Sequence, residues 1–175
     1  MATVKKNRLE GALPRLSDYM KRAAERDPKH PAFIYKDQEL SYGDFSANAH
    51  HFAKYLLKLG VKKGDRIGYV MNGRPEFYTF YMAAGMVGAI IVGMGTRFTA
   101  HEMEYVLNNS KSDYILTLHN LGEVTSYQER LAKALPNCPS VKGIWVVGGP
   151  AELPNALAWD DIMKGDYSAF DQELK

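Results

Sequence analysis

Residues that could bind a phosphate are few in this sequence, and none completes a known motif. The segment Gly93–Phe98 reads Gly-Met-Gly-Thr-Arg-Phe and lies between a predicted strand and a predicted helix, as a dinucleotide-binding loop does. Phe98 stands where that loop needs its third glycine, so a simple turn is the favoured interpretation and nucleotide binding the weaker alternative. No Gly-x-x-x-x-Gly-Lys-Ser/Thr sequence occurs. The free amides at the start of the next helix, near Thr99, are a weak anion-binding signal.

Acid–base and nucleophilic side chains also lack a catalytic pattern. The five histidines have no recognised catalytic spacing, and no Cys/His set has the spacing of zinc ligands. The single cysteine, Cys138, has no obvious paired base, which favours a packing role. The acidic pairs Glu102/Glu104 and Asp160/Asp161 are typical of helix starts and solvated loops. The sequence therefore predicts no catalytic residue and no metal site.

Two residues remain as candidate ligand contacts, because each follows a predicted strand of an open α/β sheet. Asn72 lies between a strand and a helix, where its side chain is expected to bond amides near Pro75 and Glu76, so a structural role is favoured. Arg97 follows the next strand and is the better candidate for a phosphate-bearing ligand such as CoA. A surface ion pair is the simpler alternative for Arg97.

Segments with helical and strand periodicity alternate along the chain, which predicts βαβ units and a parallel sheet covered by helices. A helix is expected at 16–26, and two short strands at 32–35 and 39–41. Ser41 and Asp44 are expected to cap a second helix that ends at Gly60. Further strands are predicted at 66–71, 89–92, 114–118 and 141–147. Further helices are predicted at 75–88, from Thr99, and from Thr125 with Gln128 as its capping partner.

Composition excludes several classes of protein. The chain has 175 residues and a net charge of +2, which gives no sign of nucleic-acid binding. Its start lacks the apolar core of a secretory signal, and a lone cysteine suits a reducing compartment, so a cytoplasmic location is predicted. No residue from Phe77 to Thr96 is charged, but four glycines and a change to β-branched residues favour a buried helix and strand over a transmembrane span.

Several short motifs, in order and at characteristic separations, resemble the N-terminal part of the AMP-forming acyl-CoA synthetases, which are adenylate-forming ligases. The motifs that carry this resemblance are Leu40-Ser41-Tyr42, Gly64-Asp65-Arg66-Ile67, Asn72 with Glu76, Gly88-Ala89, and Glu102 through Ser110. Many relatives have a proline near Gly93, so the geometry of that loop is expected to differ. The predicted organisation is a basic arm at 1–15, an α/β subdomain at 16–150, and an irregular segment at 151–175 anchored by Trp159 and Ile162.

The resemblance implies a ligase that activates a carboxylic acid with ATP and Mg²⁺ and then transfers the acyl group to CoA. Thr96-Arg97-Phe98-Thr99 is most similar to branches that activate fatty acids. The family's phosphate loop and catalytic lysine have no counterpart in these 175 residues, so this segment is expected to be a scaffold that is inactive without the remainder of its chain. Unpartnered sheet surface predicts a homodimer or aggregates. A non-catalytic binding module and a structural assembly domain are the alternatives.

Overall fold

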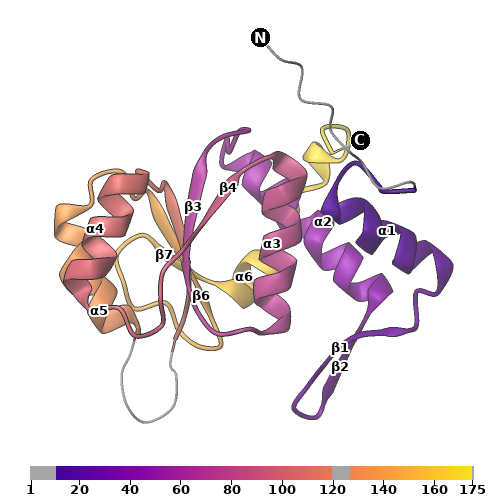
Figure 1. Cartoon of the computed structure of the whole chain (residues 1–175), viewed down its shortest axis with the longest axis horizontal. Coiled ribbons are helices and arrows are strands. Elements are labelled where there is room, and N and C mark those ends of the chain that lie inside the picture. Colours follow the sequence, from indigo (N-terminus) through magenta and orange to yellow (C-terminus); the bar gives the residue numbers. More distant parts are fainter. Residues whose placement is uncertain (1–10, 120–126, 175) are drawn as a thin grey trace.

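The computed structural model describes residues 11–119 and 127–174, and its centre is a five-stranded parallel sheet (Figure 1). The strand order is β4-β3-β5-β6-β7. The strands are β3 (Arg66–Val70), β4 (Ile90–Gly93), β5 (Tyr114–Leu118), β6 (Gly143–Val147) and β7 (Ala156–Ala158). All four pairings between neighbouring strands are parallel, which confirms the predicted α/β class.

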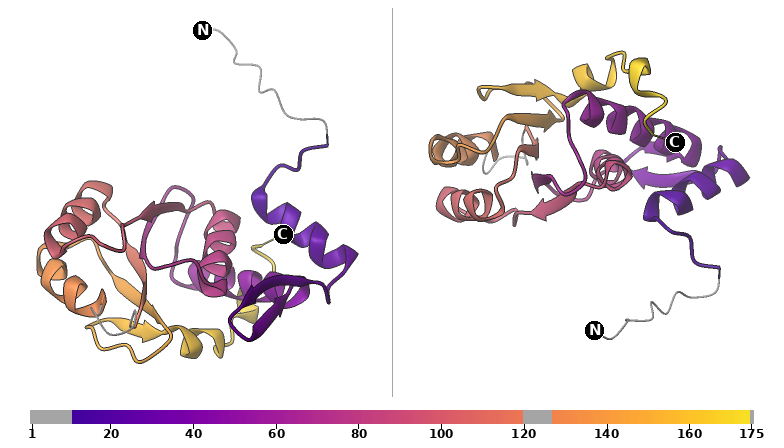
Figure 2. Two further views of the ribbon diagram at one scale, coloured as in Figure 1. Left: turned by 60° about the horizontal axis from the view of Figure 1, so that its bottom comes forward. Right: turned by 90° about the horizontal axis from the view of Figure 1, so that it is seen from above.

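Helices cover both faces of this sheet, as right-handed crossovers between parallel strands require (Figures 1 and 2). On one face lie α2 (Tyr42–Lys58) and α3 (Pro75–Val87), which pack closely on each other. On the other face lie α4 (Ala100–Ser110) and α5 (Tyr127–Ala134). The short α6 (Trp159–Met163) packs beside α2. The predicted three-layer arrangement is therefore confirmed.

A second, smaller unit precedes the sheet. It consists of α1 (Leu16–Arg26) and an antiparallel hairpin of β1 (Pro31–Tyr35) and β2 (Gln38–Ser41). Its own apolar cluster is formed by Met20, Phe45 and Ala49. Because Phe45 and Ala49 belong to α2, this helix connects the small unit to the main sheet.

The main core is built around aromatic side chains from distant parts of the sequence. Phe52 on α2 stacks on Trp159, with ring centroids 4.6 Å apart, and contacts the edge of Trp145 at 5.1 Å. The Trp145 indole N–H donates to the Tyr55 hydroxyl over 3.2 Å, so this buried polar group is satisfied. Trp159 is 6% exposed, in agreement with its predicted role as an anchor.

Helix ends follow the local signals in the sequence. The Ser41 hydroxyl oxygen accepts the Asp44 amide N–H over 3.1 Å at the start of α2. Gly60 and Gly88 follow α2 and α3 with φ of +77° and +76°, a left-handed conformation that favours glycine. At Gly88 a side chain would also lie 2.9 Å from Lys63. These residues end their helices where the next strands must begin.

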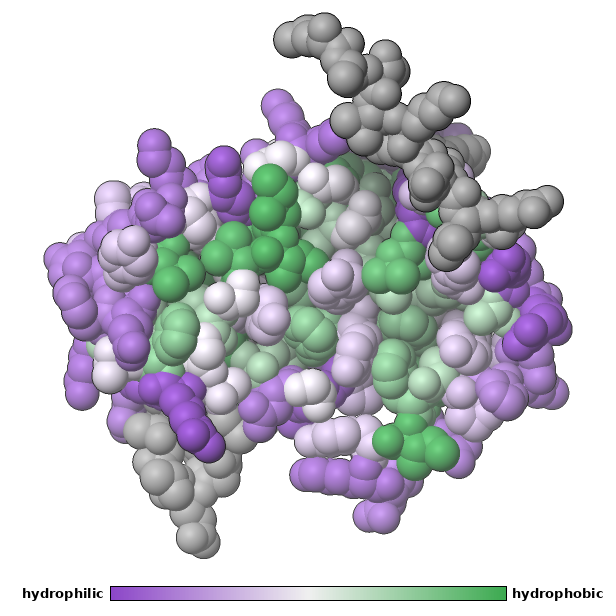
Figure 3. All heavy atoms as spheres, in the orientation of Figure 1, coloured by the Kyte–Doolittle hydropathy of each residue, from purple (hydrophilic) through white to green (hydrophobic). Residues whose placement is uncertain are grey.

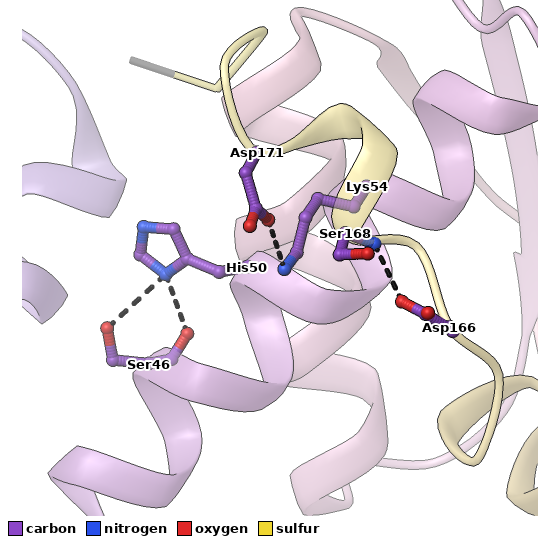
Figure 4. A network of polar contacts seen from close by, with 6 residues as sticks. All are labelled: Ser46, His50, Lys54, Asp166, Ser168 and Asp171. Carbon is purple, nitrogen blue, oxygen red and sulfur yellow. Dashed lines mark hydrogen bonds and ion pairs between the residues drawn. The ribbon is translucent and has the colours of Figure 1, made fainter.

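The segment 151–174 is more regular than the sequence suggests, because it contains β7, α6 and the 3₁₀ turn η2 (Ser168–Phe170). Figure 4 shows how its end is attached to α2: Lys54 Nζ lies 2.7 Å from an Asp171 carboxylate oxygen. Asp166 accepts the Ser168 amide N–H over 2.9 Å, and this bond lowers the pKa of Asp166. His50, on the same helix, is half-buried, with Nδ1 2.7 Å from the Ser46 carbonyl oxygen.

In the ranges that the structure describes, no helix is long and apolar enough to cross a membrane. The uncharged stretch 77–96 forms most of α3, a turn at Gly88, strand β4 and the loop that follows it. This division into a helix and a strand is the predicted one.

Candidate functional site

The carboxyl edge of the sheet is the place where this topology favours a ligand. From β3 the chain moves to β4 on one side, whereas β5 pairs with β3 on the other side. Open α/β sheets bind ligands at the carboxyl ends of strands where the order reverses in this way. The loops after β3 and β4, His119 after β5 and the residues that follow β6 all lie at this edge. Both predicted contact residues, Asn72 and Arg97, are among them.

After β3, the well-ordered polar group is Arg74 rather than Asn72. The Arg74 guanidinium donates two hydrogen bonds to the Glu76 carboxylate, at 3.0 and 3.2 Å, and these bonds raise the pKa of Arg74. It also lies over the Tyr35 ring, 5.3 Å from its centroid. Among the described residues the exposed Asn72 side chain makes no hydrogen bond. Glu76 is thus occupied by Arg74, and a ligand contact by Asn72 stays a prediction.

Arg74 and Glu76 also border a hollow of about 430 Å³. It opens between the β1–β2 hairpin and the start of α3, and Asn48 and Trp159 complete its inner wall. The hairpin contributes mostly polar side chains to the outer wall. Its lining has two basic and three acidic side chains, so this hollow has no strong preference for an anion.

After β4, a fixed loop presents Arg97 to solvent. Arg130 on α5 donates from Nη1 to the carbonyl oxygens of Thr96 and Phe98, over 3.0 and 2.7 Å. Arg97, between these two residues, is exposed and has no ion pair within the described part of the chain. The sequence analysis did not identify Arg130, because its partners are backbone atoms more than thirty residues away. Arg97 therefore stays a candidate contact on a well-held loop.

The glycines of this loop do not form a phosphate cradle. A side chain at Gly95 would lie 2.7 Å from the Phe98 ring, so the missing Cβ accommodates Phe98. The interpretation of Gly93–Phe98 as a turn is consistent with this packing. The start of α4 is also occupied: Thr99 N–H donates to the Glu102 carboxylate over 2.7 Å, and Glu102 N–H donates back to the Thr99 hydroxyl over 3.3 Å. These bonds form a capping box and lower the pKa of Glu102.

The ends of β5 and β6 are joined by Gln128, which is only 2% exposed. Its Nε2 donates to the Pro150 carbonyl oxygen over 3.1 Å and lies 2.9 Å from Nδ1 of His119. Its Oε1 accepts the Glu152 amide N–H over 2.8 Å. The expected capping partner, Thr125, lies outside the described residues. Gln128 thus holds together three segments that meet at the carboxyl edge.

No catalytic set appears at this edge among the described residues. Residues 11–119 and 127–174 contain no group of three His, Cys, Asp or Glu side chains placed to hold a metal ion. Cys138 is buried, with its thiol donating to the Ala134 carbonyl oxygen over 3.3 Å, and burial raises its pKa. The arrangement can position loops and present one arginine, but it supplies no nucleophile paired with a base.

Comparison with known proteins agrees with the motifs. A model of the family described as AMP-binding enzyme matches residues 20–167. One relative is a medium/long-chain-fatty-acid–CoA/3-oxocholest-4-en-26-oate–CoA ligase of Mycolicibacterium smegmatis, to which the chain is 32% identical over 132 residues. This alignment covers 75% of this chain and 23% of the relative. A ligase of the same name from Mycobacterium marinum is 30% identical over 168 residues, or 90% of this chain and 29% of the relative.

Solved structures show the same fold. A putative long-chain-fatty-acid CoA ligase from Rhodopseudomonas palustris superposes with a TM-score of 0.74 at 26% identity, over 85% of this chain and 36% of that chain. The anthranilate CoA ligase AuaEII superposes with a TM-score of 0.77 at 23% identity, over 86% of this chain and 28% of that chain, which supports the fold alone. The chain spans about a quarter of the length of the curated relatives it matches, 23% and 29% in the two cases above. Since the family model covers most of the sequence, the chain belongs to the AMP-binding enzyme family.

Proposed function

We propose that this chain is the N-terminal segment of an AMP-forming acyl-CoA ligase that activates a fatty acid with ATP and transfers the acyl group to CoA. The observation that carries the proposal is the match of residues 20–167 to the AMP-binding family, together with about 30% identity to two fatty-acid–CoA ligases. The fatty-acid class is supported by the printed names of those relatives. A cytoplasmic location is part of the same proposal.

In this proposal, neither the loop after β4 nor the start of α4 binds the phosphates of ATP. The glycine loop after β4 is filled by Phe98, and at the start of α4 the amides of Thr99 and Glu102 each donate to the other residue's side chain. No cluster of metal-binding side chains is found in the described ranges. We therefore assign ATP and Mg²⁺ to the remainder of the ligase chain. We assign no catalytic residue to this segment.

CoA is the ligand for which these residues offer a contact. Arg97 is exposed on a loop that Arg130 holds in place, and a guanidinium suits a phosphate group. In this proposal Arg97 binds a CoA phosphate, and the rest of the segment is a scaffold that forms one wall of the substrate site.

The first experiment expresses the open reading frame that contains this sequence and measures ATP–pyrophosphate exchange with a panel of carboxylic acids. Exchange that depends on a fatty acid, with none from the 175-residue chain by itself, is the expected result. A longer product that is folded but catalyses no exchange with any acid would refute the ligase proposal. Saturable CoA or acyl-chain binding by the 175 residues, without exchange by the longer product, would support a binding module instead.

The role of Arg97 is tested in that active ligase. Arg97→Ala is expected to raise the KM for CoA by about 5-fold, the effect of losing one exposed charge contact, and to leave ATP–pyrophosphate exchange unchanged. Lys62→Ala is the matched control, because Lys62 is also exposed but lies at the opposite, amino edge of the sheet. If both variants have the same KM for CoA, Arg97 does not contact CoA and this assignment is wrong.

A further inference from the structure

Strand β4 forms one of the two edges of the sheet. Ile90 and Met94 donate their N–H groups to the carbonyl oxygens of Asp65 and Tyr69, on the β3 side, over 2.7 and 2.9 Å. Because backbone groups alternate in direction along a strand, the N–H and C=O groups of Ile91 and Gly93 point away from β3. In the described chain no strand pairs with this edge. Two residues therefore offer four backbone groups to another strand.

Natural proteins protect such an edge with charges, proline or a very short strand. β4 has four residues, so its short length is the only one of these protections that it has. The stretch from Phe77 to Thr96, which includes β4, contains no charged residue and no proline. The opposite edge strand, β7, has only three residues. Neither a charge nor a proline therefore protects the β4 edge.

Apolar side chains surround this edge on the face shown in Figure 3, where hydrophobic residues gather over β4 between α4 and α3. Ile90 is 48% exposed, Tyr81 on α3 is 40% exposed and Leu16 on α1 is 55% exposed. A hollow of about 420 Å³ lies beside the edge, lined by Leu16, Tyr81, Gly85, Ile91 and Gly93 among others. The edge and its surroundings together form a neutral apolar surface, which we call the β4 surface.

We propose that the β4 surface is a self-association site at which a second copy of this chain pairs β4 with β4 in antiparallel orientation. The outward-pointing residues Ile91 and Gly93 are placed symmetrically about Val92. A two-fold axis at Val92 therefore sets Ile91 of each copy opposite Gly93 of the other and satisfies all four pairs of backbone groups. The two five-stranded sheets become one sheet of ten strands.

Three features favour a second copy as the occupant. A two-fold contact places identical patches against each other, so it needs a patch without net charge, and the β4 surface is neutral. Gly93, which has no side chain, leaves room for Ile91 of the opposite copy. Leu16 and Tyr81 extend the contact beyond the strands themselves, as an interface of ordinary size requires.

Analytical ultracentrifugation of the 175-residue chain at increasing concentrations tests this proposal. We expect a monomer–dimer equilibrium, and we expect Ile90→Lys to raise the dimer dissociation constant on the order of 100-fold, because each dimer loses two apolar side chains and gains two like charges. Ile34→Lys is the matched control: Ile34 is 72% exposed on the hairpin and is not part of the β4 surface. Circular dichroism spectra of both variants establish that they fold.

Amide hydrogen exchange supplies a second readout that identifies the strand. The Ile91 and Gly93 amides should become protected as dimer forms, whereas the Val92 amide, which faces β3, should be protected at every concentration. A monomer at all concentrations would overturn the proposal and leave the edge for a later segment of a longer chain. The proposal would also be overturned if Ile34→Lys disrupted the dimer and Ile90→Lys did not. Dimers in which the Ile91 and Gly93 amides exchange freely would overturn it as well.

Discussion

Replacing Gln128 with methionine tests whether one buried side chain holds the carboxyl edge of the sheet together. Methionine has a similar length and shape but can neither donate to the Pro150 carbonyl oxygen nor accept the Glu152 N–H. It also removes the contact with His119. Gln128 is 2% exposed, so water cannot easily replace these partners.

The expected cost follows from the three contacts, at 2.8, 2.9 and 3.1 Å. Each buried hydrogen bond contributes a net of about 0.5–1.5 kcal/mol. We therefore expect Gln128→Met to lower the free energy of unfolding by about 2–4 kcal/mol. Domains of this kind have a total stability of about 5–15 kcal/mol, so the loss is substantial. The corresponding fall in Tm is about 4–16 °C for a chain of this size.

Urea unfolding followed by circular dichroism measures this change, at a protein concentration low enough to avoid association. Gln38→Met is the matched control, because Gln38 is exposed at the start of β2 and its replacement should change stability by less than about 0.5 kcal/mol. If Gln128→Met and Gln38→Met have the same small effect, Gln128 does not hold the edge and our account of its hydrogen bonds is wrong.

Three further predictions concern single groups. Tyr55→Phe leaves the buried Trp145 N–H without its acceptor, so it should lower the free energy of unfolding in urea by about 1–3 kcal/mol. In a Trp145→Phe background the same substitution should have a much smaller effect. Equal effects in both backgrounds would contradict this account. The Glu102 carboxylate has a lowered pKa in the folded state, so its stabilising effect is present above the unfolded pKa of about 4.3 and is lost as pH falls through the folded value. Glu102→Gln should therefore destabilise the chain at pH 7 and make little difference near pH 2, as measured by urea unfolding at both pH values; an equal effect at both would count against the capping box. The buried Cys138 thiol, with its raised pKa, should react with a thiol reagent only after urea unfolds the chain, and fast labelling of the native protein would disprove its burial.

The sequence predicted those elements whose signals are local. The bounds of α1 and β5 agree with the prediction, because Pro28 follows the helix and a compact apolar run defines the strand. Other boundaries differ by a residue or two, as at β4, where the strand begins at Ile90 rather than Ala89. The helix stops at Gly60 and Gly88 were predictable because glycine is favoured where φ is positive.

Elements that depend on distant partners could not be predicted in this way. Strand β7 has the sequence Ala-Leu-Ala, which favours a helix as much as a strand, and it is extended because it pairs with β6 through Trp145 and Leu157. The candidate site shows the same limit. The residues that hold the carboxyl edge, Gln128 and Arg130, act on backbone atoms of loops far away in the sequence, and no periodicity marks such a contact.

The position of Phe52 between two tryptophans has a consequence for how the chain folds as it is synthesised. Trp145 and Trp159 are the only tryptophans in the sequence, and both rings pack on this one side chain from α2. A nascent chain on the ribosome can form α2 early, but it cannot complete this core until residue 159 has left the exit tunnel. Tryptophan fluorescence of this chain, which arises only from these two rings, therefore reports the packing of the second half of the chain onto α2.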